Sequence, residues 1–257
     1  YPVNTEFSKY FGMNAYFPRL ACHGTDTVDA LLDMTPDLLW ESAKEALMIA
    51  RQIGKKVIIM STSTGGTLSL KLAADFPEYV DGLILFSPNI RINNNSAFLL
   101  SGPWGLQFAR KVYNSRYRVT NPDFASKECQ YWYCKYRLEA VVFLQQLIDA
   151  TMKNETFNRI TAPVFLGYYY QDNEHQDEVV KVKAMLKMFE QLSTDDDRKV
   201  KKAFENFTMM DFVGAASMLM LDIDEKQDNL LIADIVFNNW KKIKNNKAKK
   251  DMGLLFI

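Results

Sequence analysis

The sequence predicts an α/β protein in which a mostly parallel sheet is flanked by helices. Strand-like and helix-like segments alternate along its 257 residues, and this alternation is typical of a parallel sheet covered by helices. The chain is long enough to bury a sizeable core. Its composition, 48% hydrophobic and 24% charged residues, is typical of a globular protein.

The clearest local pattern is a helix over residues 35–54. Thr35 is suited to cap it, Pro36 fits its first turn, and Gly54 ends it. The segment NAYFPRL predicts an earlier strand. The other expected elements are strands at 55–60, 80–88, 162–170 and 198–206, and helices at 67–76, 178–192 and 229–243.

Residues 90–157 differ in character from the segments on either side. They are rich in asparagine and aromatic residues and contain short helical patterns. We therefore expect a cap insertion at 90–157 and a core formed by 1–89 and 158–257. The lysine-rich run at 241–250 predicts a solvated tail.

Charge and cysteine content exclude several classes of protein. The 31 basic residues balance the 31 acidic ones, so no global field favours nucleic acid. No apolar run is long enough to span a membrane. The cysteines, Cys22, Cys129 and Cys134, lack the spacing of a metal site. Neither a metal nor a cofactor is expected. Their odd number argues against a disulfide framework and favours a reducing, cytoplasmic location. Because the first residue is Tyr rather than Met, an upstream signal or anchor remains open.

The segment STSTGG, residues 61–66, lies between an apolar strand and a helix. A nucleophilic serine on such a sheet needs a sharp turn with small residues two positions before and after it. Ser61 and Gly65 meet this requirement around Ser63. The N–H of Thr64, at the start of the helix, is placed to stabilise an oxyanion. The alternative interpretation is that Ser63 only caps the helix.

Three segments resemble the α/β-hydrolase superfamily, in particular bacterial carboxylesterases and monoacylglycerol-lipase-like serine hydrolases. They are PRLACHGTDT, VIIMSTSTGGTLSLKLAADFPEYVDGLILFSP and APVFLGYYYQDNEHQDEVV, and the similarity covers about residues 7–206. The resemblance implies an α/β-hydrolase fold with Ser63 as nucleophile and an acid after the strand at 162–170. Asp172 is the first choice for this acid, and Asp177 is the alternative. Without the resemblance, this loop is best interpreted as solvated.

The base implied by the resemblance is missing. The family carries a histidine after its last strand, but the matching segment AFENFTMMDFVGAAS (203–217) has none. Asp211 is a weak base for a serine hydroxyl unless its pKa is raised. The two histidines of the chain are His23, expected to be structural, and His175. His175 can serve as the catalytic base only if its loop folds back over Ser63.

The family also places a strand and an oxyanion loop ahead of a helix like TEFSKYFGM, and the sequence starts at that helix. We therefore expect these N-terminal strands to be missing. The leading function is hydrolysis of a small acyl ester or lipid-like substrate through a Ser63 acyl-enzyme. The aromatic cap suits an apolar acyl chain, although its aromatics serve equally well as a cap core. The alternative is a silent hydrolase fold that binds a small hydrophobic ligand or a partner.

Overall fold

A computed structural model describes residues 2–24, 29–126, 129, 132–205 and 252–257. The expected helix at 229–243 and the lysine-rich run at 241–250 lie outside these residues. The described helices and strands are α1 (Pro2–Phe11), β1 (Asn14–Tyr16), α2 (Pro36–Ile53), β2 (Lys56–Thr62), α3 (Thr64–Asp75), β3 (Gly82–Phe86), η1 (Ala97–Ser101), α4 (Gly105–Tyr113), β4 (Tyr117–Val119), β5 (Lys135–Arg137), α5 (Leu138–Thr151), α6 (Asn154–Phe157), β6 (Val164–Tyr169), α7 (Val182–Glu190), η3 (Asp196–Arg198), β7 (Lys199–Phe204) and β8 (Met252–Phe256).

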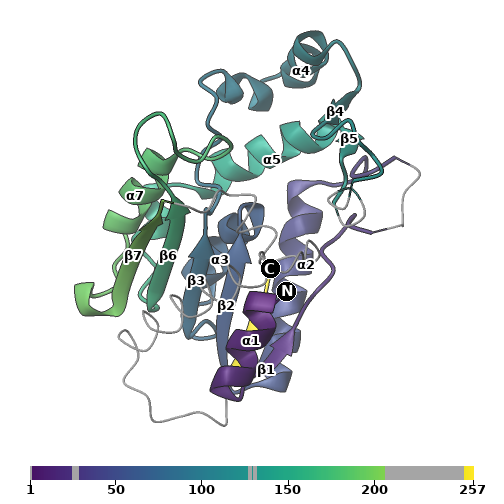
Figure 1. The fold of residues 1–257 in the computed structure, drawn as a ribbon. Helices are drawn as coiled ribbons and strands as arrows, with labels where there is room; N and C mark the ends of the chain where they lie inside the picture. Colours follow the sequence, from purple (N-terminus) through teal and green to yellow (C-terminus); the bar gives the residue numbers. More distant parts are fainter. Residues whose placement is uncertain (1, 25–28, 127–128, 130–131, 206–251) are drawn as a thin grey trace.

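Six of the described strands form one sheet in the order β1-β8-β2-β3-β6-β7, shown in Figure 1. Every pair of neighbours in this sheet is parallel. The central strand β3 is buried along its whole length, as expected for a parallel strand covered on both faces. The predicted fold class, a mostly parallel sheet flanked by helices, is therefore confirmed.

The strand β8 was not among the strands predicted from the sequence. The structure places residues 252–256 between β1 and β2, where Gly253 pairs with both Asn14 and Val57. Leu254 and Leu255 are fully buried there. A short apolar segment does not reveal its partners, because strand pairing depends on contacts far away in sequence.

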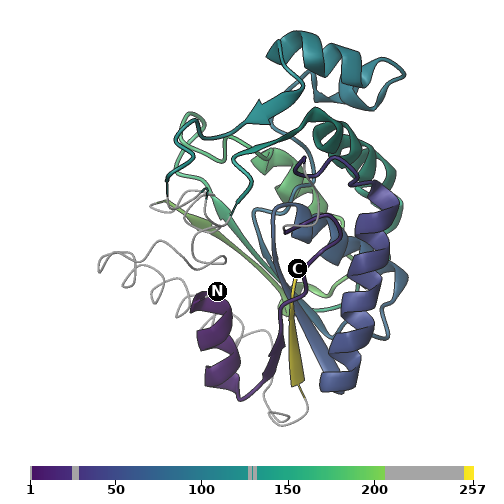
Figure 2. The same cartoon turned by 90° about the vertical axis from the view of Figure 1, so that its right-hand side faces the viewer.

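The helix α2 forms as its sequence predicts. The Thr35 side chain accepts a hydrogen bond from the Leu38 N–H, Pro36 begins the helix, and Gly54 ends it. Its buried stripe packs on the same face of the sheet as α3, α5 and α7. Figure 2 shows α1 on the opposite face. Helices thus cover both sides of the sheet and leave the carboxyl ends of its strands to form a site.

Between β3 and β6 the chain forms η1, α4, the β4–β5 hairpin, α5 and α6. Leu147 and Phe157, from α5 and α6, belong to the main core. In contrast, η1 and α4 form a small core of their own against α5. Figures 1 and 2 both place α4 at the outer end of the molecule, beyond α5. The division into a core and a cap at 90–157 remains a prediction, and the second part of that range contributes to the main core.

A cluster of charged side chains holds this outer region in place. The Arg137 guanidinium bonds Asp29 at 2.8 Å and Glu139 at 2.7 Å. Arg110 of α4 also bonds Glu139, at 2.8 Å, and the Tyr117 hydroxyl donates to Asp29. The hydrogen bond from Arg137 lowers the pKa of Asp29. The cluster ties α4 and the hairpin to the segment that precedes α2.

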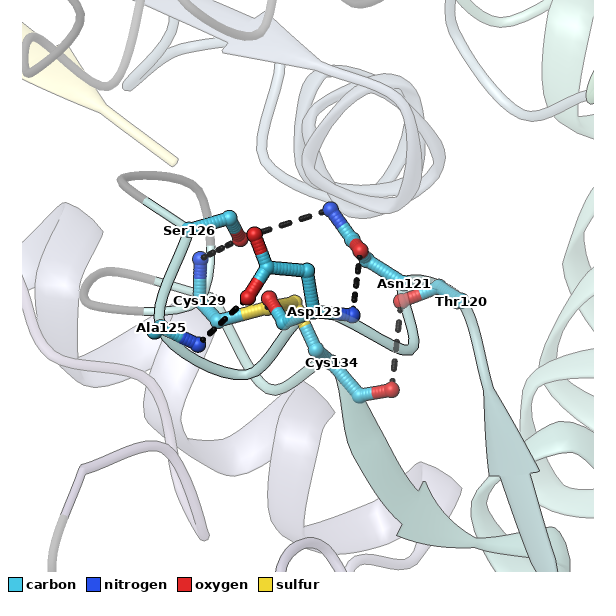
Figure 3. The surroundings of a disulfide bond; sticks show 7 residues. All are labelled: Thr120, Asn121, Asp123, Ala125, Ser126, Cys129 and Cys134. Atoms are coloured by element: carbon cyan, nitrogen blue, oxygen red, sulfur yellow. Dashed lines mark hydrogen bonds between the residues drawn. A yellow bond between two sulfur atoms is a disulfide. The ribbon is translucent and has the colours of Figure 1, made fainter.

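Cys129 and Cys134 form a disulfide, drawn in Figure 3. The expectation that the odd cysteine count argues against a disulfide is wrong for this pair. The chain folds back so that the Thr120 N–H bonds the Cys134 carbonyl at 2.9 Å and the Cys129 N–H bonds Ser126. These turns bring Cys129 and Cys134 together. The cysteine count therefore gives no support to a cytoplasmic location.

None of the described helices is long and apolar enough to cross a membrane. No group of histidine, cysteine, aspartate and glutamate side chains in the described part of the chain is arranged to hold a metal ion.

Candidate active site

Ser63 occupies a sharp turn between β2 and α3. Its backbone angles are φ 52° and ψ −117°, a conformation that few residues other than glycine adopt and that costs about 1–3 kcal/mol. The Ser63 N–H bonds the Phe86 carbonyl at 3.1 Å, and its carbonyl accepts from the Asn89 N–H at 2.8 Å. No side-chain capping bond is formed at this position. Ser63 therefore does not act as an ordinary helix cap, and backbone bonds to β3 and the segment after it hold its strained geometry.

The neighbours of Ser63 must be small, as the sequence predicted. A Cβ atom on Gly65 would lie 2.1 Å from the Ile257 carbonyl oxygen, and one on Gly66 would lie 2.5 Å from the Pro88 Cβ. Ser61 is fully buried beneath the turn. The end of β8 and the segment after β3 thus press against the turn from two sides and allow no larger residue.

Thr64 is the first residue of α3. The first N–H groups of a helix have no acceptor within the helix and carry its positive dipole end. The Thr64 N–H is therefore available to an acceptor beside Ser63. The oxyanion role expected for this N–H from the sequence stays a prediction.

Asp177 lies on the segment after β6, and only 1% of its surface is exposed. One carboxylate oxygen, Oδ1, accepts from the Val179 and Val180 N–H groups at 3.0 and 2.9 Å. The other, Oδ2, forms no hydrogen bond of normal geometry in the described part of the chain, although the Ser87 hydroxyl lies near the carboxylate. Burial raises the pKa of Asp177, an effect opposed by these N–H groups and by the nearby Ser87 hydroxyl. A buried carboxylate oxygen without a partner is costly, which points to a group that it is meant to bind.

Asp172 and His175 lie together on an exposed loop that is closed by a bridge between Tyr170 and Gln176. The His175 Nδ1 is 2.9 Å from the Asp172 carboxylate, and their side chains are 60% and 52% exposed. The hydrogen bond from His175 is the main cause of the lowered pKa of Asp172. The structure brings these two predicted residues together. Among the described residues it forms no hydrogen bond between either of them and Ser63.

His23, the second histidine, lies in the loop after β1. Its Nδ1 is 2.9 Å from the Ala21 carbonyl oxygen, a local contact that fits the structural role expected for it. The segment expected to carry the base continues from β7, and residues 206–217 of it lie outside the described residues. Met209, Met210, Asp211 and Phe212 are among these.

Sequence reasoning missed a group of polar side chains around the turn whose oxygen atoms are buried. Each has an oxygen without a partner in the described part of the chain, and each follows or ends a strand at the same edge of the sheet as Ser63. Ser87 has a φ of 39°, a second strained position at this edge. The available signal was the segment SPN directly after β3. The members are Thr62, Ser87, Asn89 and Asp177.

The sequence was compared with known protein families. A family model described as serine aminopeptidase, S33, matches residues 41–206, well over half of the chain. The protein belongs to this family of α/β hydrolases. The matched range includes the Ser63 turn, Asp172 and Asp177. No curated protein sequence matches the chain.

Solved structures show that the hydrolase fold extends over most of the chain. A structure of metagenome-derived lipolytic enzymes matches with a TM-score of 0.64 and 17% identity, and covers 88% of this chain and 80% of that one. The monoacylglycerol lipase of Paleococcus ferrophilus matches with a TM-score of 0.53 and 14% identity, covering 80% and 76%. At such low identities the likeness is one of fold. The chain therefore has the α/β-hydrolase fold that its sequence predicted.

Proposed function

We propose that this hydrolase cleaves carboxylic esters of lipid-like substrates through an acyl-enzyme on Ser63. The observation that carries the proposal is the Ser63 backbone, held at φ 52° between β2 and α3. Such strain persists at functional sites because the surrounding structure imposes it. The turn presents the hydroxyl at the edge of the sheet and beside the first N–H of a helix.

The reaction follows from these positions. The Ser63 Oγ attacks the acyl carbon while a general base takes its proton, and the Thr64 N–H stabilises the resulting oxyanion. The tetrahedral adduct collapses, and the protonated base returns that proton to the alcohol as it leaves. Water then attacks the acyl-enzyme and releases the acid, which restores Ser63. Substrates with an apolar acyl chain are supported by the lipolytic enzymes among the structural neighbours.

We also propose that Asp177, rather than Asp172, is the acid that orients the catalytic base at this site. Its buried Oδ2 forms no hydrogen bond of normal geometry among the described residues, whereas the Asp172 carboxylate is exposed and already bonds His175. A triad acid is buried and holds the base in one orientation. Asp177 is buried, and its Oδ2 can accept a hydrogen bond from a base and so hold that base in one orientation.

The experiment is labelling with a fluorophosphonate probe, followed by turnover of p-nitrophenyl esters. Wild type is expected to be labelled, and Ser63→Ala should abolish labelling. Asp177→Asn should reduce ester turnover by roughly 10²-fold or more, while the matched change Asp172→Asn leaves it unchanged. Absence of both labelling and turnover in the wild type would overturn the esterase proposal in favour of a silent, ligand-binding fold.

The base is tested with the same assay. If the exposed Asp172–His175 pair is confined to its loop, His175→Ala keeps full turnover. A His175→Ala variant without turnover, together with an inactive Asp172→Asn variant, would return the acid role to Asp172. Ester turnover of Asp211→Asn tests Asp211, the other candidate base named from the sequence.

A further inference from the structure

The outer end of the molecule carries large apolar side chains that are mostly exposed. Phe98 of η1 is 61% exposed, Trp104 at the start of α4 is 74% exposed, and Val112 is 63% exposed. By helical spacing, Trp104, Lys111 and Val112 (i, i+7 and i+8) share one side of α4, and Val112 adjoins the side that buries Gly105 and Ala109. Exposed aromatic and aliphatic groups gathered at one place mark an interaction surface.

The chain segment that carries these side chains is basic. Residues 90–122 hold five arginines and lysines and no acidic residue, although the whole chain is neutral. Arg110 is bound to Glu139, and Arg118 lies over the Tyr136 ring. Lys111 and Arg116, in contrast, form no ion pair in the described part of the chain and are exposed. Two cations are thus left beside the apolar groups.

The ion pairs of Arg137 with Asp29 and Glu139 hold the segments that form this surface to the rest of the molecule. Arg137 joins the hairpin to the segment before α2, and Glu139 receives Arg110 from α4 itself. Figures 1 and 2 show α4 at the far end of the molecule from the lower part of the sheet. A flat partner can therefore reach α4 without contacting the sheet.

We infer that this outer surface, formed by Phe98, Trp104, Lys111, Val112 and Arg116, docks on a lipid membrane with anionic headgroups. Apolar side chains flanked by free cations suit the boundary between headgroups and acyl chains. The cations would lie at the level of the phosphates, and the tryptophan would lie at the interface, where its ring is favoured. The inference goes beyond ester hydrolysis and does not depend on Ser63 being active.

The test is flotation of the protein with vesicles of phosphatidylcholine, alone or mixed with phosphatidylserine. We expect binding to the mixed vesicles, little binding to phosphatidylcholine alone, and release by high salt. Lys111→Gln with Arg116→Gln should lower the partition coefficient about 25-fold, since each cation near the surface contributes about fivefold. Trp104→Ala should lower it about tenfold.

A matched control removes two exposed cations elsewhere. Lys183→Gln with Lys187→Gln, on α7, makes the same charge change and should leave binding unchanged. Ser63→Ala should also bind as wild type does, which separates docking from catalysis. Failure to bind mixed vesicles, or equal losses in the α4 and α7 double variants, would overturn the inference. So would a stable dimer in solution that Trp104→Ala dissociates, because the surface would then be covered by a second copy.

Discussion

Replacing Ser63 by glycine should make the protein more stable while destroying its proposed nucleophile. The Ser63 backbone, at φ 52° and ψ −117°, costs about 1–3 kcal/mol for a residue with a Cβ and little for glycine. Glycine loses about 0.4–1 kcal/mol of this gain through the greater freedom of the unfolded chain. The net expectation is a stabilisation of about 1 kcal/mol.

Ser63→Ala is the matched control. It removes the same hydroxyl but keeps the Cβ and therefore the strain. The hydroxyl makes no capping bond, so its loss should change stability by less than about 0.5 kcal/mol. Both variants should lose probe labelling, and only the glycine variant should gain stability.

The assay is equilibrium unfolding in urea. With an m-value of about 2–3 kcal/mol/M, the glycine variant should shift the midpoint upward by about 0.3–0.5 M. A midpoint for Ser63→Gly at or below that of Ser63→Ala would refute the reasoning, because it would show that no strain is released at this turn.

Two further predictions concern the same edge of the sheet. Gly65→Ala should destabilise the fold by about 2–3 kcal/mol, because its Cβ would lie 2.1 Å from a backbone oxygen. Gly102→Ala, with its nearest atom at 3.4 Å, should cost under about 0.5 kcal/mol in the same urea titration. Asp177→Asn should be increasingly more stable than wild type as the pH rises. Burial raises the folded pKa of Asp177 above its ordinary value of 3.8, so the wild type loses stability as the pH rises through that raised pKa. Unfolding midpoints at pH 3 and pH 7 measure the trend, and a constant difference between the two proteins would contradict it.

Local features of the sequence predicted much of the fold. The Thr35 cap, the helix it begins and the strand before Ser63 follow from neighbouring residues alone, and the structure confirms them. The Ser63 turn was predictable for the same reason, since close packing requires small residues at fixed spacing.

Features that depend on distant contacts were not predictable. The segment MGLLF gives no sign that it pairs with β1 and β2. Asp172 and Asp177 look alike in sequence, and only the fold buries one and exposes the other. Likewise, the count of three cysteines could not show that Cys129 and Cys134 approach each other.

The place of β8 in the sheet has a consequence for how the chain reaches its native state. Lys56 pairs with Met252 across most of the sequence, so β1 joins the sheet only after residues near 252 have been synthesised. Closing so long a loop costs about 2 kcal/mol more than closing one of 20 residues, and such pairings fold slowly. Until then β2 presents an open edge on a nascent chain, where pairing with another molecule competes with folding. We therefore expect the yield of folded protein to depend on chaperones and on the rate of synthesis.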